Sequence, residues 1–164
     1  MKFESRVDMK SEHGYSLVEM LTVFFIIATL SAIAIPSYMQ WRESLEYREA
    51  AREVASILRL AQSGATGNTN RQHRVRFVQA TRQYCIERGN RNSNSVLWPQ
   101  VTGWMTLPSS VNAIPDTTIV FNPDGLATLP GGGLSNTINI QDKNAATRFQ
   151  VVITATSRIS IARP

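Results

Sequence analysis

Residues 17–35 read LVEMLTVFFIIATLSAIAI, and this apolar stretch decides the fold because Glu19 is its only charged residue. Together with the two preceding residues it contains 21 residues, and an α-helix of that length is about 31 Å long. That length matches the hydrocarbon core of a bilayer. Pro36 follows directly and is expected to kink or end the helix. We therefore expect an apolar transmembrane helix over residues 15–36.

The helix is expected to continue in amphipathic form over residues 37–64. Apolar residues recur there at three- and four-residue steps, which places them in one stripe along the helix. Gly64 and then Gly67-Asn68 are expected to stop it. The result is one long helix from about Tyr15 to Gln62, whose second half needs a surface to pack against. The stripe consists of Leu45, Ala51, Val54, Leu58 and Ala61.

Residues 65–164 are predicted to form a β-rich domain. The segment 73–78 (HRVRFV) alternates basic and apolar residues, and the segment 83–88 is its expected hairpin partner. Because a helix is followed only by strands, we predict an α+β fold with an antiparallel sheet packed on the helix stripe. Further strands are expected at 117–121, 126–129, 137–141, 149–154 and 159–161, with a strong turn signal at Asn122-Pro123-Asp124-Gly125.

The excess positive charge lies in the C-terminal half of the chain. The net charge is +5, and beyond Gln62 nine arginines and one lysine stand against four carboxylates. A solvated basic surface explains this composition. Cys85 is the only cysteine, so an intramolecular disulfide is excluded, and we expect it on an inward strand face. Neither Cys85 nor His73 has neighbours that indicate a metal site, a cofactor or a nucleophile–base pair, so we expect no enzyme.

Three interpretations compete for residues 1–40. An ordinary secretory signal would be cut after Ala32-Ile33-Ala34, but residues 1–14 carry no net positive charge and the cut would discard half of a continuing helix. A plain single-span anchor explains the length of the apolar run. It leaves Glu19 and the abrupt start of the run after Gly14 unexplained.

The third interpretation rests on the motif His13-Gly14-Tyr15-Ser16-Leu17-Val18-Glu19, which resembles the cleavage motif of type IV prepilins. The resemblance implies that a prepilin peptidase removes the leader 1–14 by cutting between Gly14 and Tyr15, and methylates the new amino group of Tyr15. The family usually has Lys or Arg before the Gly and Phe after it, so His13 and Tyr15 are departures. The resemblance further implies a single-pass protein of the bacterial inner membrane with its C-terminal domain in the periplasm.

Glu19 has a physical rationale of its own. A carboxylate among apolar residues in hydrocarbon costs a few kcal/mol, so it is expected to find a partner. The nearest positive charge that cleavage creates is the α-amino group of Tyr15, in the same subunit or in a staggered neighbour. We therefore expect Glu19 to pair charges during assembly with other pilin or pseudopilin subunits. The alternative is a glutamate that extends to the lipid headgroups.

The C-terminal half resembles the GspH/FimT group of minor pilins and pseudopilins. The resemblance rests on the strand–turn–strand at 119–128 and on the closing strand at 153–161, where Ser157 replaces the usual Gly. It implies a minor subunit that primes or caps a type IV pilus; the alternative is a minor pseudopilin of a type II secretion system. A second alternative is a DNA-binding minor pilin for natural transformation. Its expected DNA contacts are Arg71, Arg74, Arg76, Arg158 and Arg163.

Overall fold

The computed structural model describes residues 16–67, 70–154 and 156–164. One α-helix precedes a series of β-strands, as the sequence predicts. The chain divides into two compact units, one ending at Gln40 and the other running from Trp41 to Pro164. Helix α1 (Leu17–Thr66) contributes to both units, and all the strands belong to the second unit.

Helix α1 extends further than the sequence predicts. Pro36 lies inside it, so the proline does not end the helix. Gly64 lies inside it as well, so the first predicted stop is wrong. The last helical residue is Thr66, four residues beyond the expected end at Gln62 and directly before the second predicted stop, which begins at Gly67. Because Gly64 has no side chain, a neighbouring ring can approach the helix closely at this position. The ring of His73 packs against it, 3.0 Å from the place where a Cβ atom of residue 64 would lie.

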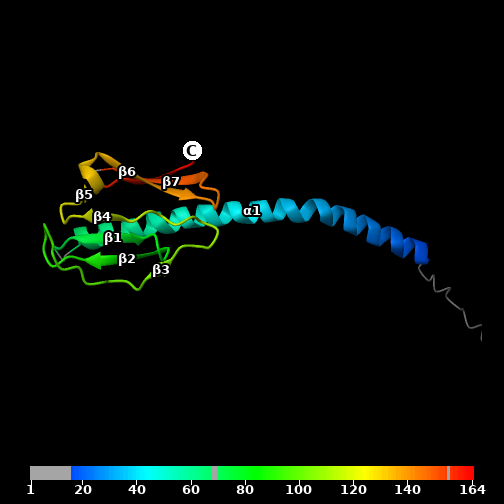
Figure 1. Cartoon of the computed structure of the whole chain (residues 1–164), viewed down its shortest axis with the longest axis horizontal. Coiled ribbons are helices and arrows are strands. Elements are labelled where there is room, and N and C mark those ends of the chain that lie inside the picture. Colours follow the sequence, from blue (N-terminus) through cyan, green and yellow to red (C-terminus); the bar gives the residue numbers. More distant parts are fainter. Residues whose placement is uncertain (1–15, 68–69, 155) are drawn as a thin grey trace, which may run out of the picture. The chain divides into compact units, whose positions relative to one another are not determined.

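The second half of α1 packs against the strands through its apolar stripe (Figure 1). Ala51, Val54, Leu58 and Ala61 are fully buried, which confirms four positions of the predicted stripe, and Leu45 is half-buried. The buried surface is wider than the stripe, since further apolar residues beside it add to the contact. The additional buried residues are Tyr47, Ala50, Ala55, Ile57 and Ala65.

Five strands form the larger antiparallel sheet, in the order β3-β2-β1-β4-β5. The hairpin of β1 and β2 and the strand β4 have the predicted bounds, and the predicted strand 126–129 is shortened to two residues. Alternation explains the arrangement: Val75 and Phe77 face the core, and Arg74 and Arg76 face away from it. The strands are β1 (His73–Val78), β2 (Gln83–Arg88), β3 (Met105–Thr106), β4 (Thr117–Phe121) and β5 (Ala127–Thr128).

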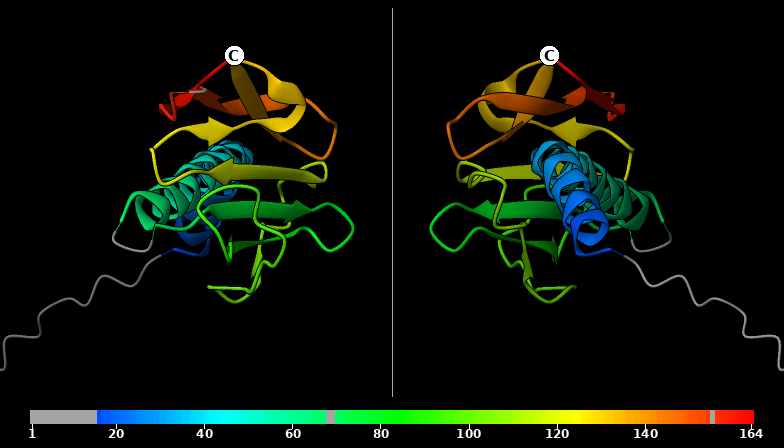
Figure 2. Two further views of the ribbon diagram at one scale, coloured as in Figure 1. Left: turned by 90° about the vertical axis from the view of Figure 1, so that its left-hand side faces the viewer. Right: turned by 90° about the vertical axis from the view of Figure 1, so that its right-hand side faces the viewer.

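Three strands form the second antiparallel sheet, in the order β6-β7-β8. They lie where the sequence predicts strands, and each is one or two residues longer. Figures 1 and 2 place β6 and β7 on the side of β4 that is opposite to β1 and β2. Both sheets contribute to a single hydrophobic core with α1. The elements are the short 3-10 turn η1 (Pro130–Gly132), β6 (Ser135–Gln141), β7 (Thr147–Thr154) and β8 (Ile159–Ala162).

The expected inward position of Cys85 is wrong. In the β1–β2 register Phe77 pairs with Tyr84 and Arg76 with Cys85, so Cys85 shares the outer face of the sheet with Arg76. It is nevertheless fully buried, because the segment between β2 and β3 covers that face. Burial raises the pKa of the Cys85 thiol, which keeps the thiol protonated and unreactive.

The turn between β7 and β8 has a left-handed residue where Ser157 replaces the glycine that is usual in the group it resembles. Ser157 has a φ of 59°, a left-handed value that suits glycine. Its backbone N–H donates to the carbonyl of Thr154 at 2.8 Å. The Ser157 hydroxyl is buried without a hydrogen-bond partner, so the residue carries both backbone strain and an unsatisfied polar group.

Candidate assembly helix and arginine surface

The first unit presents an apolar helix surface. Of residues 17–40 all are exposed except Ser31, which is half-buried. The exposed residues include large apolar side chains, such as Phe25 with 71% and Leu30 with 63% of their surface accessible. Helix α1 is long and apolar enough to cross a membrane. Such a surface is suited to lipid or to packing with other helices.

The two threonines of this apolar segment are hydrogen-bonded within the helix. The hydroxyl of Thr22 donates to the carbonyl of Val18 at 2.8 Å, and the hydroxyl of Thr29 donates to the carbonyl of Ile26 at 2.8 Å. Threonines that return their hydrogen bonds to the helix backbone expose no unpaired donor. These two threonines are therefore compatible with a hydrocarbon environment.

Glu19 lies in the first turn of α1. A carboxylate is favourable there because the helix N-terminus carries partial positive charge. The side chain is exposed, and so is available to a partner outside the chain. Gly14 and Tyr15 lie outside the described residues. Cleavage, methylation and the pairing of Glu19 with the Tyr15 amine therefore stay predictions.

Two of the predicted DNA-contacting arginines are held by one carboxylate. Nε of Arg74 donates to Oε2 of Glu87 at 2.5 Å, and Nε of Arg76 lies 3.3 Å from Oε1. The Glu87 side chain is only 6% exposed, so it is a buried anion with two cationic neighbours. The register predicts this arrangement, since Arg74 lies opposite Glu87 in the β1–β2 hairpin.

The same two arginines also stack on tryptophans. The guanidinium carbon of Arg74 lies 4.1 Å from the ring centre of Trp98, and that of Arg76 lies 5.1 Å from the ring centre of Trp104. Both distances are within the range of cation–π contacts. Sequence reasoning missed these partners because the segment that carries the tryptophans is mostly irregular, so no periodicity places it over the sheet.

The other predicted arginines are exposed and lie elsewhere in the second unit. Arg71 precedes β1 of the five-stranded sheet, whereas Arg158 and Arg163 flank β8 of the three-stranded sheet. The structure therefore distributes the five arginines over two sheets. Arg163 lines a groove of about 490 Å³ with Arg48 and Arg52 of α1. Neither of these helix arginines is among the residues that the sequence singled out.

Side chains that could bind a metal ion are not grouped together in the described part of the chain. Among residues 16–67, 70–154 and 156–164, no three His, Cys, Asp or Glu side chains are grouped so that they could hold a metal ion. The hydroxyl of Tyr84 has a strongly raised pKa. Burial and its hydrogen bond to the Glu53 carboxylate raise the pKa of the Tyr84 hydroxyl, which makes this contact a packing element between β2 and α1.

Comparison with known families supports the N-terminal motif. Residues 9–35 match the family model described as the prokaryotic N-terminal methylation motif. Two curated fimbrial proteins of Pseudomonas aeruginosa are each 36% identical over 55 residues, which is 34% of this chain and 36% of the relative. The chain thus matches these relatives over about a third of their length.

Comparison with solved structures supports the fold. Two structures of the minor pseudopilin EpsH from the type II secretion system of Vibrio cholerae are similar, with TM-scores of 0.57 and 0.56. The similarity covers 73% of this chain and 96–97% of EpsH at 13% sequence identity. At that identity the match establishes the shared fold, a long N-terminal helix followed by antiparallel sheets.

Proposed function

We propose that this chain, a type IV pilin-like protein, is a minor subunit of a type IV pilus that primes or caps assembly. A single observation carries the proposal: the methylation motif at 9–35 opens a helix whose apolar side chains are exposed. Residues 1–14 are the leader, which prepilin peptidase removes after Gly14 before it methylates Tyr15. The helix anchors the subunit in the inner membrane, with the second unit in the periplasm, and later packs against other subunits.

A minor pseudopilin of a type II secretion system is the alternative. The similarity to EpsH favours it, and the partial match to fimbrial proteins favours the pilus. Both are structural subunits, and neither role needs a catalytic group or a cofactor. Deleting the gene separates the two roles: loss of surface pili with normal protein secretion indicates the pilus, and the reverse indicates the secretion system.

Processing is tested by intact mass and N-terminal sequencing of the full chain from membranes that contain prepilin peptidase. A methylated chain that begins at Tyr15 is the expected product. The variant Gly14→Leu should accumulate as full-length precursor, because a bulky side chain blocks access of the protease to the scissile bond. Gly103→Ala is the matched control, since a Cβ at that exposed position meets no neighbour. Normal processing of Gly14→Leu would refute the cleavage site.

The assembly role of Glu19 needs a separate variant. Glu19→Ala should be cleaved and methylated normally but should be incorporated into filaments at a small fraction of the wild-type level. Glu43→Ala is the control, because Glu43 is an exposed glutamate in the second half of the same helix. The measurement is the amount of subunit in sheared filament fractions relative to the membrane pool. Equal incorporation of the two variants would contradict the role.

DNA binding is a second candidate function, favoured by the arrangement of Arg163 with Arg48 and Arg52 along one groove. Arg71 and Arg158 are also exposed, whereas Arg74 and Arg76 share the Glu87 carboxylate. Duplex DNA is titrated at several salt concentrations. Each lost phosphate contact lowers the salt slope by about 0.9, so replacing Arg158 and Arg163 by Gln should lower it by about 2. Absence of binding at low salt would remove this function.

A further inference from the structure

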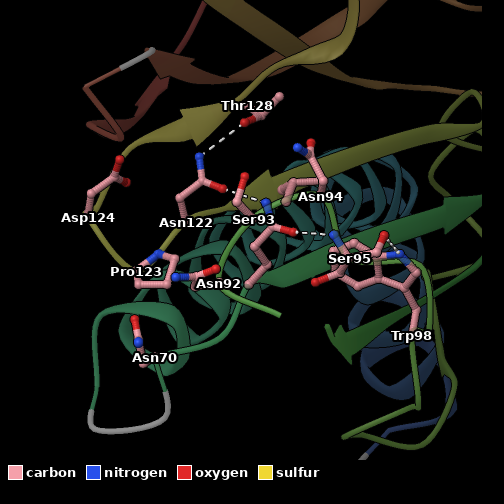
Figure 3. A pocket seen from close by; sticks show the side chains of 12 residues that line it. Asn70, Asn92, Ser93, Asn94, Ser95, Trp98, Asn122, Pro123, Asp124 and Thr128 are labelled. Atoms are coloured by element: carbon pink, nitrogen blue, oxygen red, sulfur yellow. Dashed lines mark hydrogen bonds between the residues drawn. The ribbon is translucent and has the colours of Figure 1, made fainter. Parts of the chain in front are cut away.

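A polar groove of about 550 Å³ lies in the second unit, at the end of the five-stranded sheet. One wall is the turn 92–95, which follows β2, and the other wall is the turn 122–124, which follows β4. Figure 3 shows Asp124, Pro123 and Asn70 at one end of this groove and Trp98 at the other. Neither the assembly helix nor the exposed arginines contribute to its lining.

Gln72 joins the two walls. Its side-chain Nε2 donates to Oδ1 of Asn122 at 2.6 Å, and its Oε1 accepts from the backbone N–H of Ser95 at 2.9 Å. Its backbone N–H donates to the carbonyl of Arg91 at 2.9 Å. Gln72 is 6% exposed, so these bonds are shielded from water and fix the width of the groove.

Gly89 allows the first wall to lie this close to the sheet. A Cβ atom at residue 89 would lie 2.2 Å from Oγ and 2.7 Å from Cβ of Ser95, distances that no side chain can occupy. The Gly89 N–H donates to the carbonyl of Gln72 at 2.7 Å. The Asn-rich turn is thus held at both ends, and the groove is formed before any ligand enters it.

The groove lining is polar and almost uncharged. Amide and hydroxyl side chains predominate, Asp124 supplies the single carboxylate, and no Lys or Arg is among the lining residues. Side-chain amides donate and accept at once, which matches adjacent hydroxyl groups of a sugar ring. Asp124 uses Oδ1 for the N–H of Leu126 and presents a second oxygen. The absence of lining cations disfavours phosphate or carboxylate ligands.

Trp98 gives the groove one aromatic surface. Its Nε1 donates to the carbonyl of Ser95 at 3.0 Å, which fixes the ring, and the guanidinium of Arg74 covers one ring face. A ligand at this end of the groove therefore meets a rigid, oriented indole beside the amide wall. A rigid aromatic ring next to amides suits the combination of CH groups and hydroxyls that a pyranose carries.

We propose that this groove binds a neutral oligosaccharide, with its hydroxyls on the amide side chains of the turn 92–95 and on the free carboxylate oxygen of Asp124, and with one ring near Trp98. An extended peptide is less suited to the site. Strand addition needs a sheet edge, and β5 at this edge has only two residues. The proposal is independent of the filament in which the protein is incorporated.

The test is isothermal titration of the full chain in a zwitterionic, sugar-free detergent. The two probes are maltotriose and triacetylchitotriose, and trialanine is the peptide comparator. We expect saturable binding of at least one trisaccharide. The variants Asn92→Ala and Asp124→Asn should each weaken it about 3- to 10-fold, the effect of one or two lost hydrogen bonds. Asp124→Asn keeps the oxygen that accepts from Leu126, so the turn is preserved. Asn144→Ala, at an exposed asparagine in the turn between β6 and β7, is the matched control and should bind as the wild type does.

Three results would overturn the proposal. The first is no saturable binding of either trisaccharide, and the second is binding that both groove variants leave unchanged. The third is tighter binding of trialanine than of both sugars, which would reassign the groove to peptide. Amide resonances provide a second measurement that does not depend on variant folding: sugar should shift the signals of residues 92–95 and 122–124 and leave those of β7 and β8 in place. Shifts confined to the other sheet would also refute the site.

Discussion

The two halves of helix α1 are both rich in apolar residues, but their burial is opposite. Phe25 and Leu30 in the first half are largely exposed, whereas Val54 and Leu58 in the second half are completely buried. The difference lies in the pattern. Apolar residues surround the helix on all sides in the first half and form a stripe in the second. A stripe can be covered by one sheet of the same chain, but an all-round apolar surface needs lipid or other helices.

The opposite burial of the two halves of α1 is tested by the same substitution in each half. Leu58→Ala should lower the free energy of unfolding of the second unit by about 3 kcal/mol, because it leaves a cavity in a fully buried site. Leu30→Ala should change it by less than about 0.5 kcal/mol. The measurement is urea unfolding in detergent by tryptophan fluorescence, since all three tryptophans lie in the second unit. Equal losses would contradict the division into two units.

A smaller effect is expected from the polar contact that attaches the second half of α1 to the sheet. The buried hydroxyl of Tyr84 donates to the carboxylate of Glu53, and a hydrogen bond to a charged group contributes about 1.5–3 kcal/mol. Because Glu53 is exposed and can be rehydrated, Tyr84→Phe should cost only about 1 to 2 kcal/mol. Glu53→Gln keeps an acceptor and should cost less. A Tyr84→Phe variant as stable as the wild type would show that packing alone holds this contact.

The spacing of apolar residues predicted the strands and the helix correctly where it was regular over several residues. It failed at Cys85, because an irregular segment covers the outer face of the sheet there. The alternation at 73–78 fixed β1 and its partner, and the stripe fixed the buried face of α1. The apolar character of Cys85 suggested an inward position. The register places it outward. The irregular segment between β2 and β3 covers it, and no local sequence pattern encodes such a contact.

In the candidate site too, the sequence predicted the local motif but not the features that depend on tertiary contacts. The methylation motif is local in sequence and was readable without a structure. The environment of the arginines depends on tertiary contacts, so their similar charge gave no indication that Arg74 and Arg76 share Glu87 while Arg163 joins two arginines of α1. The polar groove was missed for the same reason, because Gln72 connects two turns that lie far apart in the sequence.

The turn between β7 and β8 offers a stabilising change in the second unit. Ser157→Gly should raise the free energy of unfolding by about 1 kcal/mol, because it relieves a positive φ and removes a buried hydroxyl without a partner. Ser160→Gly in β8 is the control and should destabilise by about 1 kcal/mol, since glycine weakens a strand. Thermal unfolding of both variants provides the measurement. A destabilised Ser157→Gly would mean that the hydroxyl has a role that its environment does not reveal.

The smallest expected effect is a pH dependence at the junction of α1 and β1. His73 is 6% exposed and packs against Gly64. Burial lowers the pKa of its imidazole below the ordinary 6.5, and the neighbouring charge of Arg88 lowers it further, against an opposing effect of the Arg71 carbonyl. The folded state therefore binds the proton more weakly than the unfolded state does. The contribution of His73 to the free energy of unfolding is complete above pH 6.5 and declines as the pH falls from there to the lower pKa of the folded state.

His73→Gln removes this titration. The stability of the wild type relative to the variant should therefore decrease over that pH interval. A difference that stays constant from pH 7.5 down to about 5 would show that the imidazole is protonated as easily in the fold as in the unfolded chain.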